Sequence, residues 1–354
     1  MAGINRPVWV LRSGRWEDSA THSQTHLTVS DNHRLILLFS VSCRQGLSMT
    51  IAAAWVRTLE NRAEELIICS DSRLSNGKRF DHCQKTFRFA RSDAVICFAG
   101  GTDWAYPMIV AAINAADIHL PSQTRALGLA KFKSHVVNIL NQMQREVHNF
   151  ARGENVPNVT FLFGGYDWWN KCFRIWRIHF DELSKQFKCD ERTGSNKFGG
   201  LGKIEFAGDT EWTSAFRNNL KKLAQSRYGM DMKHPDAAKF DMEPFEIIRD
   251  LLRGANAGDS IGGAPQAVKV YQYLNSADVG IFWPSVSSGR LFLAGRPLLE
   301  YESATVKSVL DPESLNSTWS SGSTADAIAQ IQKASEIDRR RTADENPIAP
   351  EIPD

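Results

Sequence analysis

A threonine that follows a methionine is the first position in this sequence where specific chemistry can be predicted. Thr50 comes directly after Met49, at the start of Met49-Thr-Ile-Ala-Ala-Ala54. An initiator methionine is normally removed when its neighbour is this small, which would leave Thr50 with a free α-amine. An α-amine has a reference pKa of about 7.7–8.0, so it can accept the proton of its own residue's hydroxyl. Thr50 is therefore a candidate nucleophile with its own base.

The segment before Thr50 differs in character from the rest of the chain. Residues 1–48 are polar, rich in Ser, Thr, Arg and His, and without sustained apolar periodicity. Either an overextended gene start or a leader that is later removed would explain the difference, and both remain open. We expect residues 1–48 to be absent from the mature protein or flexible in it.

Three segments downstream carry further candidates. Asp71 lies in Ser70-Asp-Ser-Arg73, Lys85 in Gln84-Lys-Thr-Phe87, and Gly100 in Phe98-Ala-Gly-Gly-Thr-Asp103. Taken singly, an aspartate in a turn, a lysine on a strand and a glycine pair are ordinary structural residues. The occurrence of all three in this order after Thr50 is what indicates a catalytic site.

In residue type and spacing, Thr50, Asp71, Lys85 and Gly100 resemble the proteasome β-subunit family of N-terminal nucleophile (Ntn) hydrolases, most closely its bacterial proteasome-like branch. The resemblance covers residues 49–300 and includes Phe206-Ala-Gly-Asp209 and Gly258-Asp-Ser-Ile-Gly-Gly263. It implies that Thr50 is the nucleophile, that Asp71 positions the lysine, and that Lys85 lowers the pKa of the threonine hydroxyl. It further implies that the Gly100 N–H binds the oxyanion and that Asp259 lies near the threonine amine.

The sequence departs from the family pattern at two positions. Where the family commonly carries a serine that bonds the nucleophile's amine, this chain has Gly208, and the neighbouring Asp209 is the candidate replacement. Where the pattern places a second serine, this chain has Gly262, with Ser260 close by.

The function that this resemblance implies is peptide or amide hydrolysis by a threonine-type peptidase, through an acyl-enzyme ester on Thr50. We expect a peptide or protein substrate, with a small amide as an open alternative, and neither cofactor nor metal. The family also implies a homo-oligomeric ring or spiral built on outer helices such as Trp104–Ala116. The competing interpretation is a catalytically inactive proteasome-like subunit with a role in assembly. The sequence does not specify an ATPase partner.

The elements that would position these residues alternate between strands and helices. Apolar patterns predict strands at Ile51–Val56, Leu66–Ser70, Lys85–Phe89 and Ala94–Phe98, and helices at Trp104–Ala116 and Leu127–Asn149. A hairpin at Val159–Phe163 and Cys172–Phe180, turning at Gly164-Gly-Tyr-Asp167, precedes helices at Thr210–Gln225 and Glu243–Arg253 and strands at Val279–Trp283 and Arg290–Ala294. This order predicts an α+β protein, a four-layer αββα sandwich over residues 49–300. Residues 301–354 are expected to be a mostly disordered tail with a short helix near 325–338.

Composition narrows the class of protein further. The 354 residues (39.7 kDa) are 42% hydrophobic and 23% charged with a net charge of +2, so no overall field favours nucleic acid or an anionic membrane. Six widely spaced cysteines without CxxC and nine histidines without HExxH do not indicate a metal site. No apolar run reaches the roughly 18 residues of a membrane span. We expect a cytoplasmic protein that binds neither nucleic acid nor membrane.

Overall fold

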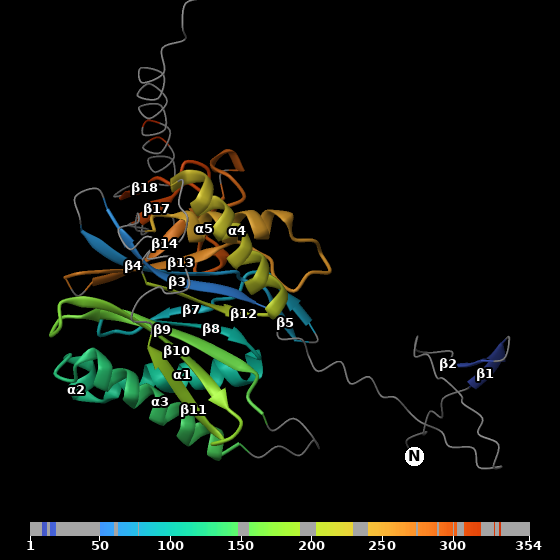
Figure 1. Cartoon of the computed structure of the whole chain (residues 1–354), viewed down its shortest axis with the longest axis horizontal. Helices are drawn as coiled ribbons and strands as arrows, with labels where there is room; N and C mark the ends of the chain where they lie inside the picture. Colours follow the sequence, from blue (N-terminus) through green and yellow to red (C-terminus); the bar gives the residue numbers. More distant parts are fainter. Residues whose placement is uncertain are drawn as a thin grey trace, which may run out of the picture. The chain divides into compact units, whose positions relative to one another are not determined.

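The computed structural model describes residues 9–12, 15–18, 50–59, 63–76, 78–147, 156–191, 203–228, 240–273, 275–288, 290–299, 301–302 and 308–319, together with residues 329 and 333. The chain divides into two compact units, Met1–Gln45 and Gly46–Asp354. In the first unit, β1 (Trp9–Arg12) pairs antiparallel with β2 (Arg15–Asp18). The second unit combines helices with antiparallel sheets, so the protein belongs to the α+β class (Figure 1).

The larger sheet, called the large sheet below, has the strand order β12-β3-β4-β13-β14-β15-β16 within the described residues. Neighbours in this order are antiparallel, while β17 runs parallel to β14 and antiparallel to β18. Its strands are β3 (Ile51–Thr58), β4 (Glu64–Ser70), β12 (Ile204–Gly208), β13 (Gln266–Tyr271), β14 (Asn275–Phe282), β15 (Leu291–Leu293), β16 (Arg296–Pro297), β17 (Ser308–Leu310) and β18 (Ser317–Trp319).

The second sheet of this unit, called the small sheet, has the antiparallel order β11-β10-β9-β8-β7 in the described ranges. Its strands are β7 (Thr86–Arg88), β8 (Ala94–Gly100), β9 (Val159–Asp167), β10 (Cys172–Asp181) and β11 (Gln186–Glu191). A separate hairpin is formed by β5 (Leu74–Asn76) and β6 (Lys78–Phe80).

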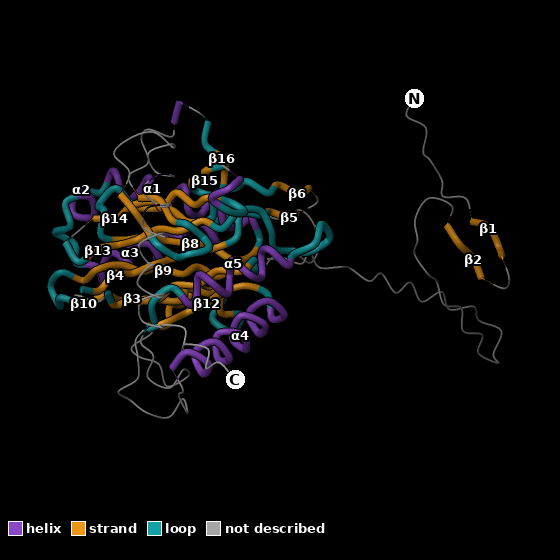
Figure 2. Tube along the Cα trace, turned by 90° about the horizontal axis from the view of Figure 1, so that it is seen from above, coloured by secondary structure: helices purple, strands orange, loops and turns teal. Residues whose placement is uncertain are grey.

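Each sheet shares a hydrophobic core with its own helices. The helices α4 (Thr210–Tyr228) and α5 (Glu243–Gly254) share one core with the large sheet, and they lie side by side in two views (Figures 1 and 2). The helices α1 (Thr102–Ile118) and α3 (Leu129–Arg145) share another core with the small sheet, with the short α2 (Leu120–Gln123) between them in the chain. A 3-10 helix at Val286–Ser288 lies between β14 and β15 in the chain. None of the helices in the described ranges has the length and hydropathy needed to cross a membrane.

Strand β3, which begins directly after Thr50, is buried on both faces. Ile51 and Trp55 lie in the core that includes α4 and α5, whereas Ala52 and Ala54 lie in a core whose other members come from both sheets. Successive side chains of a strand point to opposite faces, so a strand covered on both sides needs an uninterrupted apolar run. The run after Thr50 therefore holds that residue at the end of a rigid strand.

The hairpin prediction at Gly164-Gly-Tyr-Asp167 is wrong in its turn. These residues lie inside β9, which continues to Asp167, and the chain turns between Asp167 and Cys172. The glycines serve close packing instead, because a β-carbon on Gly165 would lie 2.3 Å from the carbonyl oxygen of Asp93. A glycine pair indicates a tight approach of backbones as readily as it indicates a turn.

Other differences concern strands that the sequence pattern does not predict. Strands β11, β12 and β13 have no counterpart in the prediction. Part of the expected tail is ordered, because Ser308–Leu310 pairs with β14 and with Ser317–Trp319. The helix expected near residues 325–338 falls almost entirely outside the described residues.

Candidate active site

Thr50 and Asp71 are brought together by the pairing of β3 with β4. Thr50 precedes β3 and Asp71 follows β4, and the antiparallel register places Ala52 opposite Ser70. The Ile51 N–H donates to Asp71 Oδ1 at 3.3 Å, and the Asp71 N–H donates to the Ile51 carbonyl at 3.2 Å. Both Thr50 and Asp71 are buried. Thr50 and Asp71 therefore lie next to each other at the same end of the β3–β4 pair.

Lys85 reaches this strand end from the segment that enters β7. Its Nζ donates hydrogen bonds to Thr50 Oγ1 at 2.9 Å and to Asp71 Oδ1 at 2.8 Å. The side chains of Lys85 and Asp71 are 0% exposed. A buried ammonium needs a partner charge and filled hydrogen bonds to be tolerated, and this one has both in Asp71 and Thr50.

The two carboxylate oxygens of Asp71 face four hydrogen-bond donors. Oδ1 accepts from Lys85 and Ile51, and Oδ2 accepts from the N–H groups of Arg73 at 3.1 Å and Gly262 at 3.3 Å. Burial raises the pKa of Asp71 above its ordinary value, and Lys85 with the N–H groups of Arg73 and Ile51 opposes that rise. Because its bonding partners are donors, this environment binds the ionised carboxylate.

The chain segment at Gly208 and Asp209 lies against Thr50. The Asp209 N–H donates to the Thr50 carbonyl at 3.3 Å, and a β-carbon on Gly208 would lie 1.9 Å from that same oxygen. Burial raises the pKa of Asp209 to about 6, with a further contribution from the charge of Asp71, while Lys85 opposes both. The carboxyl of Asp209 therefore interacts electrostatically with the Lys85–Asp71 pair, next to the position where the family resemblance places a serine.

The side chain of Arg73 leaves no room for a β-carbon at Gly262. A β-carbon at Gly262 would lie 2.3–2.5 Å from the guanidinium atoms of Arg73. That guanidinium is held by the carboxylate of Asp81 at 2.6 Å and by the carbonyls of Asn256 at 3.1 Å and Asp259 at 2.7 Å. An arginine therefore fills the space that a serine at this position would need. The type and position of Arg73 in the sequence do not by themselves indicate this contact.

Two predicted site residues have other partners. The Asp259 carboxylate accepts from the Asn256 N–H at 2.6 Å and so closes its own turn, and the Ser260 hydroxyl accepts from Trp212 Nε1 at 2.6 Å. The structure joins the site to this segment through the Arg73 bond to the Asp259 carbonyl and the Gly262 bond to Asp71. Direct roles for Asp259 and Ser260 toward Thr50 stay predictions.

Gly100 ends β8, the strand that pairs with β7 after Lys85. The Phe98 N–H donates to the Lys85 carbonyl at 3.3 Å, which places Gly100 two residues beyond a direct bond to the lysine segment. Gly101 follows and donates to the Asn158 carbonyl at 2.6 Å before α1 begins. The use of the Gly100 N–H as an oxyanion donor stays a prediction.

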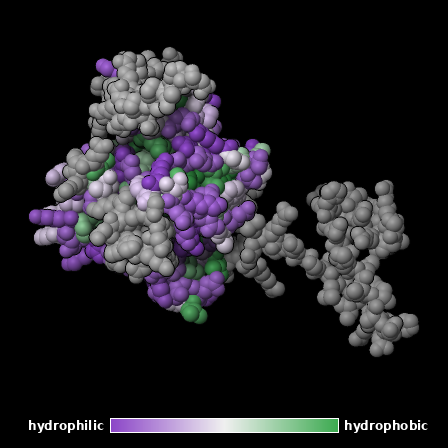
Figure 3. Space-filling model, turned by 45° about the horizontal axis from the view of Figure 1, so that its top comes forward, coloured by the Kyte–Doolittle hydropathy of each residue, from purple (hydrophilic) through white to green (hydrophobic). Residues whose placement is uncertain are grey.

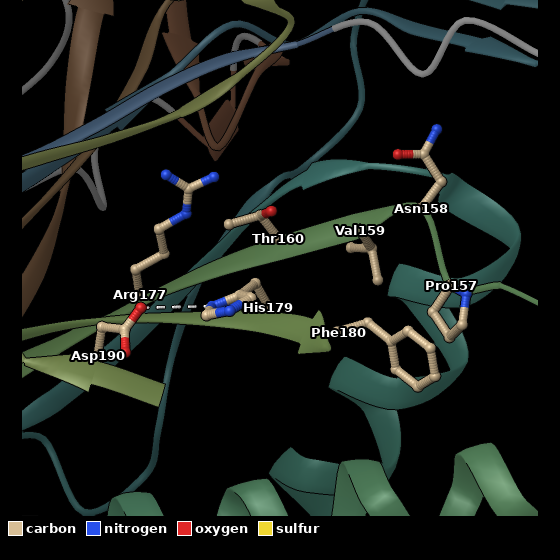
Figure 4. Close-up of a pocket in the computed structure, with 8 residues that line it drawn as sticks. All are labelled: Pro157, Asn158, Val159, Thr160, Arg177, His179, Phe180 and Asp190. Carbon is tan, nitrogen blue, oxygen red and sulfur yellow. Dashed lines mark ion pairs between the residues drawn. The ribbon is translucent and has the colours of Figure 1, made fainter. Parts of the chain in front are cut away.

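A pocket of about 420 Å³ lies beside β9 and β10, near Asn158 (Figure 4). Its polar lining includes Arg177, Thr160 and an ion pair of 3.7 Å between His179 and Asp190. Its lining does not include Thr50, Asp71 or Lys85. Among the described residues, no group of three or more His, Cys, Asp or Glu side chains could hold a metal ion.

No family model matches this chain, and no curated protein matches it in sequence. The site consists of a threonine hydroxyl in direct contact with a buried ammonium, which is in turn held by a buried carboxylate. A positive charge at 2.9 Å from a hydroxyl oxygen stabilises the alkoxide that attack on a carbonyl requires.

Proposed function

We propose that this chain is an Ntn hydrolase of the proteasome-like kind, a threonine-type peptidase or amidase whose nucleophile is Thr50. The observation that carries the proposal is the Lys85 ammonium, which donates to both Thr50 Oγ1 and Asp71 Oδ1 while fully buried. The ion pair with Asp71 would by itself satisfy a structural role for Lys85, so the second hydrogen bond, to the Thr50 hydroxyl, is the contact that indicates chemistry.

The proposed reaction proceeds through an ester on Thr50. Its Oγ attacks the substrate carbonyl, its α-amine takes the hydroxyl proton and passes it to the leaving nitrogen, and Lys85 stabilises the developing charge. The Gly100 N–H binds the oxyanion of the tetrahedral intermediate, and water then releases the acid. While residues 1–49 remain attached, the nitrogen of Thr50 is an amide and cannot act as a base. Release of Thr50 is therefore part of the proposal.

The packing of the elements supports the Ntn-hydrolase fold, in which two antiparallel sheets lie between two helix layers. One core joins the large sheet to α4 and α5, a second joins the small sheet to α1 and α3, and a third contains residues of both sheets. Figure 1 shows the two helix pairs on opposite outer sides of the sheets. We infer a four-layer αββα order from these three cores.

We also propose, on the family resemblance, that the protein acts in the cytoplasm as a homo-oligomeric ring or spiral. Exposed apolar side chains on and beside α1 support self-association: Val110 is 51% exposed, Ile118 85% and Leu120 64%. The face shown in Figure 3 is mostly hydrophilic, with hydrophobic side chains gathered in a few separate places. The region of α1 and α2 that exposes these three apolar side chains is therefore a better candidate for an interface than a mixed surface of that kind.

A second candidate function is an inactive subunit that serves assembly. The observation that favours it is the contact between Gly208 and the Thr50 carbonyl, because this backbone has no room for the serine that the family places there. An inactive protein, however, needs Lys85 only as the countercharge of Asp71 and does not need its hydrogen bond to the Thr50 hydroxyl.

Active-site labelling of the protein processed to begin at Thr50 separates the two. An epoxyketone or β-lactone probe should modify Thr50, and Thr50→Ala should abolish both labelling and hydrolysis of peptide substrates while leaving the protein folded. Thr50→Ser is the matched variant and should keep measurable activity, since it retains the hydroxyl. Hydrolysis by Thr50→Ala at the wild-type rate would contradict the proposal, and a folded wild type that is never labelled would favour the assembly role.

A further inference from the structure

Gln266 holds together the two chain segments that carry Lys85 and Asp71. It is the first residue of β13 and is only 1% exposed. Its Nε2 donates to the carbonyls of Asp71 at 2.9 Å and Cys83 at 3.0 Å. Its Oε1 accepts from the N–H groups of Lys85 at 2.9 Å and Thr86 at 3.2 Å, and from the Thr86 hydroxyl at 3.1 Å. One side chain thus bridges the loop after β4 to the segment before β7.

The partners of Gln266 determine both its orientation and its residue type. The backbone carbonyls on one side can only accept, and the backbone N–H groups on the other can only donate, so the side chain must offer a donor and an acceptor in that order. A glutamate would present a second oxygen to the Asp71 and Cys83 carbonyls, and an asparagine is one methylene too short to span both segments. Buried backbone groups left without partners are costly, so the bridge is strongly specified.

The bridge fixes the position of the Lys85 backbone, from which its side chain extends to the site. The Lys85 N–H and the Asp71 carbonyl bond to opposite ends of the same amide, and the Lys85 Nζ then meets Asp71 Oδ1 and Thr50 Oγ1. A shift between the two segments would therefore change the distance from the ammonium to the hydroxyl. Misplacement of a catalytic group by about 1 Å can reduce a rate by about 10²-fold.

We propose that Gln266 is a positioning residue for the Thr50 hydrolase: through its amide it fixes the backbone of Lys85 relative to that of Asp71, so that the ammonium reaches the threonine hydroxyl. This inference rests on the proposed function. Gln266 acts through Lys85 and Asp71.

The variants that test this role are Gln266→Ala, which removes the bridge, and Gln266→Glu, which keeps its shape and its acceptor and loses its donor. The matched control is Asn141→Ala. Asn141 on α3 also bridges distant backbone with its amide, donating to the Phe187 carbonyl at 3.2 Å and accepting from the Phe187 N–H at 2.6 Å. Those bonds join α3 to β11, in a core that includes none of Thr50, Asp71 or Lys85.

The measurement is the rate at which a β-lactone probe acylates Thr50 in the protein processed to begin at Thr50, followed by mass spectrometry and resolved into the saturating rate and the half-saturating concentration. We expect both Gln266 variants to lower the saturating rate by about 10²-fold while the half-saturating concentration stays within about threefold of wild type. Asn141→Ala should lose thermal stability and keep the wild-type saturating rate. Should Gln266→Ala fail to fold, Gln266→Glu decides the question.

The outcomes separate the two proposals. A wild-type protein whose Thr50 is never acylated overturns the proposed function. A labelled wild type together with a folded Gln266→Glu of equal saturating rate overturns the positioning role alone. Equal losses of saturating rate in Gln266→Glu and Asn141→Ala also overturn it, because the effect would then reflect general destabilisation.

Discussion

The carbonyl oxygen of Thr50 lies so close to Gly208 that a β-carbon on that glycine would be 1.9 Å from it. Gly208 also has a φ of +142°, a conformation that residues with a β-carbon rarely adopt. The proximity results from the register of β12 with β3, which places Gly208 opposite Ile51. The close pairing of β12 with the start of β3 therefore requires a glycine at position 208.

Replacing Gly208 with alanine should lower the free energy of unfolding by at least about 2 kcal/mol, because steric overlap and backbone strain add. Gly254→Ala is the matched control, since a β-carbon on Gly254 meets nothing within 4 Å. Urea denaturation of both variants checks the prediction. Equal stability of Gly208→Ala and Gly254→Ala would show that β12 does not hold Thr50 in this way.

Lys85→Met should be strongly destabilising, because it leaves the Asp71 carboxylate buried without its countercharge. The expected loss is about 3–5 kcal/mol in the free energy of unfolding, with loss of Thr50 labelling. Arg91→Met provides the comparison, since Arg91 and Asp93 form another ion pair with 0% exposed side chains, away from Thr50. It should cost a similar amount of stability and leave labelling at the wild-type rate in the folded fraction. Loss of labelling in both variants would mean that stability alone explains the effect of Lys85.

Asp209 should make stability depend on pH in the acidic range. Its pKa is raised to about 6 in the folded protein, above the ordinary value of about 3.9, so the folded state binds a proton more tightly than the unfolded state does. The stabilisation is complete below about pH 4 and is lost as the pH rises through about 6.

The difference between wild type and Asp209→Asn should therefore change by about 1 kcal/mol between about pH 4 and pH 7, in favour of the variant at the higher pH, after allowing for solvent screening at this partly exposed carboxyl. Thermal unfolding across that range measures the difference. Asp117→Asn, at an exposed aspartate of α1, is the control. A difference that stays constant with pH would contradict the raised pKa of Asp209.

Gly262 and Arg73 should be energetically coupled, because the guanidinium occupies the space beside the glycine. Gly262→Ser should cost about 2 kcal/mol in the wild-type background, since it displaces Arg73 from Asp81 and from the Asn256 and Asp259 carbonyls. In an Arg73→Ala background the same change should cost much less. A double-mutant cycle measures the coupling, expected at about 1–3 kcal/mol. Strict additivity would show that the arginine does not exclude the serine.

The family resemblance in residue type and spacing predicted Thr50, Asp71 and Lys85, and the structure brings these three residues together. The apolar runs after Thr50 and before Asp71 predict two strands, and their antiparallel pairing as β3 and β4 brings the two residues together. Lys85 lies in the segment that enters β7. Its N–H bonds Gln266 of the large sheet, and its ammonium then reaches Asp71. The α+β class likewise follows from the alternation of strand and helix patterns.

The remainder depended on contacts that carry no sequence signal. A single glutamine at the start of an apolar run does not indicate that Gln266 will bridge Asp71 and Lys85. The Asp259 carboxylate bonds the Asn256 N–H in its own turn, a contact that the sequence does not indicate, and its place near the threonine amine stays a prediction. Local bonds of this kind depend on backbone conformation, which residue type alone does not determine.

The N-terminus of the protein made from its own gene tests the central claim most directly, since Thr50 can act as its own base only when nothing precedes it. Intact mass and N-terminal sequencing of the purified, folded protein, before and after treatment with an epoxyketone, provide the measurement. We predict a chain that starts at Thr50 and gains one probe per subunit on that residue. A folded protein that keeps Met49 or earlier residues and gains no probe would contradict the account.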